Sequence, residues 1–251
     1  HLGSNWLFYF SSAFAAIAIL LFQWLPETKP VKSEKNKFEF KISSLFYWPA
    51  WKPSLLMGLV CISLGTLLTI MPDFTQYLGY KDKGYYLSIY IATSLFFRLI
   101  SGRISDKLGR AWSTSIGTFF QIISMGILVA ISLKTPINIE LFFIISALCY
   151  GLGQGFNAPS LFAWGSDTAG ELHRGKAMAM IFIFLELGII VGGLISGLFT
   201  IPSNVTAKLS ETSTMGGYWD YPAIFGLNLI SFIIAFLFSV YQIWQSRIRE
   251  C

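Results

Sequence analysis

Residues 176–200 read KAMAMIFIFLELGIIVGGLISGLFT, and after the opening lysine Glu186 is the one charged side chain in the run. About 20 consecutive, predominantly apolar residues are enough for an α-helix to cross the hydrocarbon core of a bilayer. Backbone N–H and C=O groups in lipid must be hydrogen-bonded within the protein, which a helix achieves by itself. This run therefore predicts a transmembrane helix.

Apolar runs of similar length occupy most of the rest of the chain. Of its 251 residues, 54% are hydrophobic and only 12% are charged, whereas soluble domains carry about 25% charged residues. Such a chain cannot cover its surface with polar groups, so lipid must cover much of it. We therefore predict an all-α, multi-pass integral membrane protein with about seven transmembrane helices, at residues 5–25, 53–77, 85–104, 112–133, 139–164, 176–200 and 218–244.

The positions of the tryptophans and of the basic residues support this division of the chain into transmembrane helices and connecting loops. Every tryptophan falls at or beside a predicted helix end, where its amphipathic ring prefers the headgroup layer. Lys and Arg collect on alternate connections, as they do on cytoplasmic loops. The expected organisation is a transmembrane helix at 1–26, a basic cytoplasmic loop at 27–52 and a six-helix bundle at 53–251. The cytoplasmic basic residues are Lys29, Lys32, Lys35, Lys37, Lys41, Lys52, Arg103, Lys107, Arg110, Arg174, Lys176, Arg247 and Arg249.

The same composition argues against several other classes of protein. The net charge of +5 comes from basic residues between apolar runs, not from a polar face that could bind nucleic acid. The only histidines are His1 and His173, too few for a metal-ligand cluster. No nucleophile, histidine and acid occur together in the sequence. We therefore expect no enzymatic activity, no metal and no cofactor.

A short basic stretch, Gly102-Arg-Ile-Ser-Asp-Lys-Leu-Gly-Arg110, lies between the third and fourth predicted spans. Gly102 lets a neighbouring helix approach closely, and Gly109 permits a tight reversal of the chain. Asp106 can pair with a cation near a helix N-terminus, and Arg110 supplies that cation, beside the basic Lys107. The stretch therefore predicts a charged turn between two helices.

This stretch resembles the signature loop of the major facilitator superfamily, which joins the second and third helices of each six-helix half. The fifth span, from Tyr150 through Gly155 and Pro159, is similar to the tenth helix of such transporters. The tripeptide from Pro26 resembles a common ending of the sixth helix. The resemblance implies the C-terminal six-helix half of the fold plus the preceding helix. It also implies that missing N-terminal helices, or a partner chain, complete the solute path.

Polar side chains inside two spans are candidates for the substrate cavity, since a polar group facing lipid is expensive and normally turns toward a cavity. By resemblance the second and fifth spans correspond to the seventh and tenth helices, which line the central cavity. Interhelical hydrogen bonds are the alternative role. The candidates, at helical spacing on each span, are Thr66, Thr69 and Asp73, and Ser146, Tyr150, Gln154 and Asn157.

Charged residues suggest two further roles. Glu186 lies near the middle of the sixth span, where burial favours the protonated carboxyl and a proton could be exchanged during a transport cycle. A structural, hydrogen-bonded glutamate is the alternative. Asp167, Glu171 and Arg174 are expected to join Asp106 and Arg110 in a group of cytoplasmic gating charges.

The leading functional hypothesis is a secondary active transporter in the plasma (cell inner) membrane. It would move a small-molecule substrate by alternating access, with proton coupling as a candidate mechanism. Two alternatives share the helix count: a seven-helix membrane receptor, and a half-size membrane subunit that needs a partner. The receptor does not explain the stretch from Gly102 to Arg110, and the half-size subunit remains open.

Overall fold

The computed structural model describes residues 5–24, 46–134, 138–199 and 220–250. Most of the expected central loop, residues 25–45, lies outside the described residues, as does the tripeptide from Pro26. The chain divides into two units, His1–Phe40 and Lys41–Cys251. The first contains one apolar helix, α1 (Asn5–Gln23), and the second contains a helical bundle.

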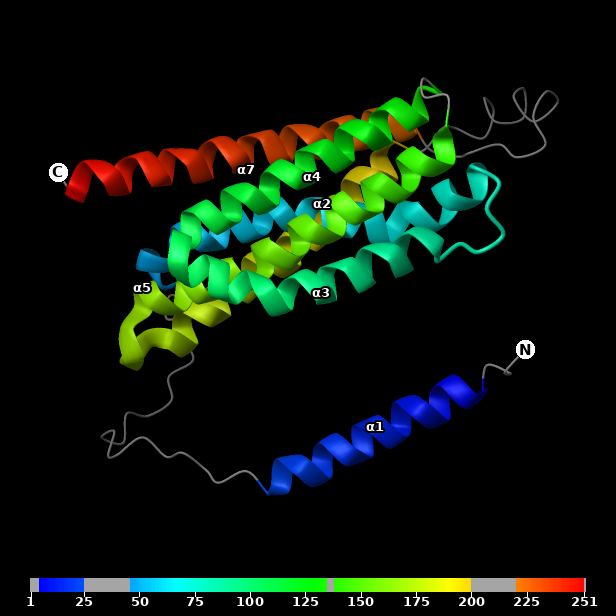
Figure 1. Cartoon of the computed structure of the whole chain (residues 1–251). Coiled ribbons are helices and arrows are strands. Elements are labelled where there is room, and N and C mark those ends of the chain that lie inside the picture. The colour runs from blue at the N-terminus through cyan, green and yellow to red at the C-terminus, as the bar shows by residue number, and fades with distance from the viewer. Residues whose placement is uncertain (1–4, 25–45, 135–137, 200–219, 251) are drawn as a thin grey trace. The chain divides into compact units, whose positions relative to one another are not determined.

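Every regular element in the described ranges is a helix, as Figure 1 shows. Up to residue 198, successive long segments of the bundle run in opposite directions, because short connections join neighbouring helices end to end. A short 3₁₀ turn precedes the first of them. The elements are η2 (Trp48–Ala50), α2 (Trp51–Tyr77), α3 (Tyr85–Leu108), α4 (Arg110–Ser132), α5 (Ile139–Leu198) and α7 (Tyr221–Glu250).

Helix α5 is 60 residues long and consists of two segments, 139–169 and 171–198. They meet at Gly170, whose φ of 60° and ψ of 176° suit a residue without a side chain. Within the described ranges, five helices are long and apolar enough to cross a membrane, and α1 contains a shorter apolar helix. Counting α5 as two segments gives the seven apolar helices expected, so the all-α membrane fold is confirmed.

Two predicted loops are mostly helical. Helix α3 continues to Leu108, so Gly109 alone separates it from α4, and its φ of 96° permits the reversal. The Gly109 N–H donates to the Ser105 carbonyl oxygen at 3.0 Å, and the Gly109 carbonyl accepts from the Ser113 N–H at 3.1 Å. The expected loop at 165–175 is helical apart from Gly170. Apolar length marks where a helix leaves the hydrocarbon, but the helix itself continues into the polar layer.

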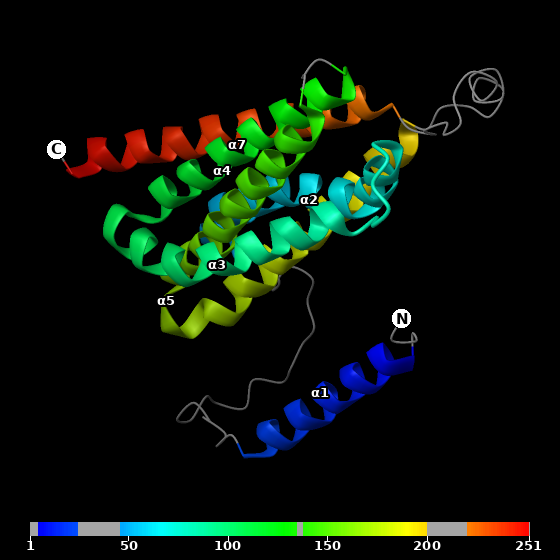
Figure 2. The same ribbon diagram turned by 45° about the vertical axis from the view of Figure 1, so that its right-hand side comes forward.

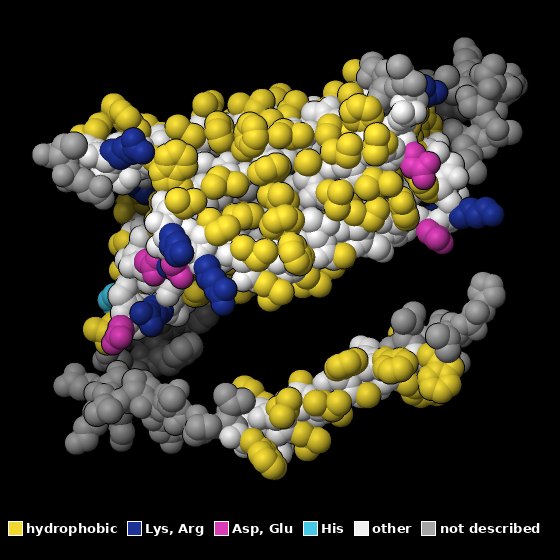
Figure 3. All heavy atoms as spheres, viewed as in Figure 1, with side chains coloured by type: hydrophobic (Ala, Val, Ile, Leu, Met, Phe, Trp, Pro, Cys, Tyr) yellow, Lys and Arg dark blue, Asp and Glu magenta, His cyan; other side chains and the backbone are white. Residues whose placement is uncertain are grey.

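Helix α5 contacts α2, α3 and α4, and α7 packs along α4 and α2. Figure 2, turned from the first view, again shows α4 and α7 side by side. The surface of the bundle carries a broad apolar band, with charged side chains gathered toward its two ends in Figure 3. This distribution is the one expected of helices whose middle portions face lipid.

Glycines allow the helices to approach closely where α5 crosses its neighbours. A Cβ at Gly151 would lie 2.5 Å from the Tyr90 carbonyl oxygen on α3, and one at Gly155 would lie 2.9 Å from the Ser94 carbonyl oxygen. On the second segment, a Cβ at Gly192 would overlap the Ile62 carbonyl oxygen of α2. Small residues at such crossings are typical of membrane helices. Residues 151–159 are helical throughout, and the break in α5 lies at Gly170.

Replacing Gly192 by alanine should destabilise the bundle, because the added methyl group would meet the α2 backbone, which cannot move aside cheaply. Overpacking of this kind typically costs about 1–3 kcal/mol. We expect a lower thermal unfolding temperature for Gly192→Ala in detergent. The matched control is Gly197→Ala on the same segment, where a Cβ would meet no described atom within 4 Å. Equal unfolding temperatures for the two variants would contradict this packing.

Candidate functional site

Arg110, the first residue of α4, connects three helix ends at one end of the bundle. Its Nε donates to Asp167 Oδ2 at 2.8 Å, and its Nη1 donates to Asp106 Oδ1 at 2.5 Å. Nη1 also donates to Ser105 Oγ at 3.1 Å. Because Gly109 turns the chain within one residue, the Arg110 side chain returns to the last turn of α3. The resulting Arg110 cluster (Asp106, Arg110 and Asp167) ties α3 and α4 to the end of the first α5 segment.

The cluster is partly open to solvent, with side-chain exposures of 25% for Arg110, 66% for Asp106 and 56% for Asp167. Exposed ion pairs of this kind contribute only about 0.2–1 kcal/mol each. The two carboxylates also lie near the N-terminus of α4, where negative charge is favoured. The cluster therefore orients the three helix ends without locking them together.

The remaining residues of the stretch and of the expected gate lie apart from this cluster. Gly102 is open: a Cβ there would meet no described atom within 4 Å, so the expected close helix approach is not made inside this bundle. Lys107, Glu171 and Arg174 are exposed. Among the described side chains, only Asp106 and Asp167 form an ion pair with Arg110.

A chain of buried side-chain amides joins α4 to α5 in the middle of the bundle. Asn157 Nδ2 donates to Gln121 Oε1 at 2.5 Å, and Gln121 Nε2 donates to Gln154 Oε1 at 3.1 Å. Two glycines, Gly117 and Gly153, provide the space, because a Cβ on either would collide with this amide chain. Gln154 and Asn157 thus face a neighbouring helix through hydrogen bonds.

A second polar group consists of hydroxyls. Tyr150 Oη lies 2.9 Å from Ser63 Oγ of α2. Tyr86 Oη of α3 lies 3.1 Å from Ser146 Oγ and 3.4 Å from Ser124 Oγ of α4. All five side chains are buried. These contacts link α5 to three different helices through neutral groups.

The candidates on α2 divide into two kinds. Thr66 is buried, and its Oγ1 donates to the carbonyl oxygens of Ile62 and Gly192, both at 3.2 Å. Thr69 and Asp73 have exposed side chains, and Thr69 Oγ1 donates to the Gly65 carbonyl at 2.8 Å. Glu186 is also exposed on the described bundle, so its expected burial is wrong for this unit taken alone. A second half of the transporter would be needed to cover it.

Sequence reasoning did not single out Gln121, Ser63 or Tyr86. A usable signal existed for Gln121, since Gly117, Gln121 and Ser124 follow helical spacing along the fourth span. That small and polar stripe faces the equivalent stripe on the fifth span. No comparable pattern marks Ser63 or Tyr86 as the partners of Tyr150 and Ser146.

The family model of the Major Facilitator Superfamily matches residues 1–137 and, in a second match, residues 54–249. The chain therefore belongs to the Major Facilitator Superfamily. It is a multi-pass integral membrane protein of the major facilitator type of transporter, as the stretch from Gly102 to Arg110 indicated. A comparison with curated proteins gave no match.

Replacing Gln121 by methionine should lower the thermal unfolding temperature, because the Gln154 and Asn157 amides would lose their shared partner. Interhelical hydrogen bonds in membranes contribute about 0.6 kcal/mol on average and at most about 1.7 kcal/mol, so the expected loss is of that order. The control is Gln76→Met, which changes an exposed glutamine on α2. An unchanged unfolding temperature for Gln121→Met would show that the amide chain does not stabilise the fold.

Proposed function

We propose that this chain supplies helices six to twelve of a secondary active transporter that moves a small solute by alternating access. The single observation that carries the proposal is the Arg110 cluster, which ties the α3–α4 turn to the end of the first α5 segment. Alternating access requires one end of a helical bundle to open and close around a fixed site. A cluster that joins three helix ends is suited to stabilise one of those states.

Energetics favour a switching role over a purely structural one. Exposed ion pairs contribute on the order of 1 kcal/mol or less, so thermal motion can break them during a transport cycle. The helices themselves are held by the glycine crossings and the buried amide chain, which do not depend on Arg110. The cluster can therefore open while the bundle stays folded.

The proposed solute path lies on the face that α2 presents with Thr69 and Asp73. Both side chains are exposed in the described bundle, although their helix belongs to the membrane. Polar and ionisable side chains of membrane helices normally face the bundle interior or a cavity and not lipid. We propose that the N-terminal helices, or a partner chain, cover this face and enclose the path.

The hydrogen-bonded candidates play a different part in the proposal. Thr66 and Tyr150 tie α2 to α5, and Gln154 and Asn157 tie α4 to α5. They set the positions of the helices that form the wall of the path.

Glu186 is the candidate for proton coupling. It lies midway along the second α5 segment, and its side chain is exposed on the bundle. Ionisable side chains within membrane helices are typical of proton pathways in transporters, and this position supports the proposal that Glu186 exchanges a proton during the cycle.

Membership in a transporter family argues against the seven-helix receptor. Two possibilities remain: a half-size subunit that pairs with a partner chain, and a longer polypeptide with further N-terminal helices. In both cases this chain presents the same polar face, so the proposed solute path is the same. Residence in the plasma membrane is part of the proposal. It is tested by locating the protein in fractionated membranes.

Asp167→Asn in the complete transporter should slow solute uptake into proteoliposomes by roughly five-fold or more, the low end of conformational coupling energies. The reason is that Arg110 loses its link to α5. The unfolding temperature should barely change, because the pair is exposed. Glu171→Gln serves as control, since it removes an exposed carboxylate from the same helix. Equal transport rates for the two variants would contradict a switching role for the Arg110 cluster.

Glu186→Gln should abolish uptake driven by a proton gradient while preserving exchange of labelled for unlabelled solute at equal pH. Glutamine keeps the shape and hydrogen-bonding capacity of the side chain but does not titrate. The measurement compares both assays in the same proteoliposomes, again with Glu171→Gln as control. Gradient-driven uptake that survives in Glu186→Gln would assign proton coupling to another group.

A further inference from the structure

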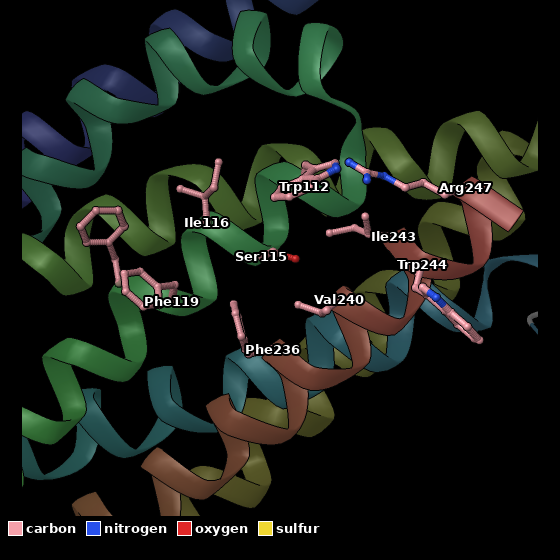
Figure 4. Close-up of a pocket in the computed structure, with 10 residues that line it drawn as sticks. Trp112, Ser115, Ile116, Phe119, Phe236, Val240, Ile243, Trp244 and Arg247 are labelled. Atoms are coloured by element: carbon pink, nitrogen blue, oxygen red, sulfur yellow. The ribbon is translucent and has the colours of Figure 1, made fainter. Parts of the chain in front are cut away.

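An apolar groove of about 560 Å³ runs between α4 and α7. Ile116 and Phe119 of α4, and Phe236 and Val240 of α7, line it in Figure 4. At its other end Trp112 and Arg247 point toward one another, with Trp244 beside them. The groove therefore runs from an aromatic and basic mouth into a largely apolar interior, in which Ser115 is the polar lining residue.

A second, polar pocket of about 760 Å³ adjoins this mouth. It shares Trp112, Ile243 and Arg247 with the groove, so the two cavities adjoin at these side chains. Lys52 and Arg110 also line it. The positive-inside pattern assigns this end of the bundle to the cytoplasmic side.

Two of the three cations here are not neutralised by described side chains. Arg110 is paired with Asp106 and Asp167. Lys52 Nζ instead donates to two neutral amides, Gln242 Oε1 at 2.7 Å and Gln245 Oε1 at 3.4 Å.

Arg247 lies 6.0 Å over the Trp112 ring, a cation–π contact that leaves its charge in place. No described carboxylate lies within ion-pair distance of Lys52 or Arg247. The polar pocket therefore has an excess of positive charge.

We propose that this composite cavity binds an anionic phospholipid of the cytoplasmic leaflet. One acyl chain occupies the groove along Phe119 and Phe236, and the phosphate lies between Lys52 and Arg247. Basic pockets between transmembrane helices on the cytoplasmic side are suited to anionic headgroups. The groove volume falls within the roughly 300–1,000 Å³ of small-molecule sites, far less than a packed helix would need.

The charges favour a lipid over a second copy of the chain. A two-fold interface formed through this groove would place Arg247 and Lys52 on the same contact face of both copies. Like charges brought together in this way oppose association. An anionic headgroup instead compensates both cations at once.

The headgroup is tested by native mass spectrometry of the purified protein, released from nanodiscs of phosphatidylglycerol and phosphatidylcholine. Wild type should retain phosphatidylglycerol preferentially. In the double variant Lys52→Gln and Arg247→Gln, the ratio of retained phosphatidylglycerol to phosphatidylcholine should fall by roughly five-fold for each cation removed. The control, Lys81→Gln and Lys83→Gln, removes two exposed lysines before α3 and should retain it.

The acyl chain is tested by filling the groove. Val240→Trp should release the retained lipid, whereas Leu237→Trp, one turn away and 61% exposed outside the groove, should not. Equal retention of phosphatidylglycerol and phosphatidylcholine by wild type would overturn the proposal. The same result would follow if Lys81→Gln and Lys83→Gln reduced the preference for phosphatidylglycerol as much as Lys52→Gln and Arg247→Gln do. Dimers that disappear in Val240→Trp, with no change in bound lipid, would assign the groove to a second copy and also overturn it.

Discussion

Hydrocarbon offers no hydrogen-bond partners, and this single constraint determines most of the structure. Backbone groups must be paired within each segment, so every described element is helical. The same solvent gives apolar side chains no strong reason to associate, and the helices instead approach through glycines such as Gly151 and Gly192. Close packing of backbones, and not burial of apolar surface from water, holds this bundle together.

Polar groups are divided by depth in the membrane. Buried positions carry neutral amides and hydroxyls, and those of Gln121 and Tyr150 form hydrogen bonds with neighbouring helices. Charged groups gather at the ends, where water weakens their attraction and makes it reversible. This division places permanent contacts at the centre and exchangeable ones around Arg110. This distribution agrees with the proposed alternation between two open states.

Much of this architecture could be predicted from the sequence. Apolar length located each helix, and the stretch from Gly102 to Arg110 predicted the pairing of Asp106 with Arg110. Of the other expected gating charges in the described residues, Asp167 pairs with Arg110, whereas Glu171 and Arg174 do not. Apolar length could not show that α3 continues through the stretch, because a helix extends beyond the hydrocarbon. Nor could it show that Gln121 is the partner of Gln154, since which faces meet depends on tertiary packing. The exposure of Glu186 was missed because burial was inferred from depth alone.

The most direct test compares three single cysteines on α7, in a variant whose native cysteines are serine, using a water-soluble thiol reagent that does not cross membranes. The sites are Asp220→Cys and Ser246→Cys near the two helix ends, and Leu237→Cys, which is 61% exposed in the isolated bundle. If hydrocarbon surrounds the middle of α7, the reagent should label intact cells at position 220 alone, and should also label position 246 after permeabilisation. Rapid labelling of position 237 would mean that water surrounds this helix, and would contradict a membrane-spanning α7.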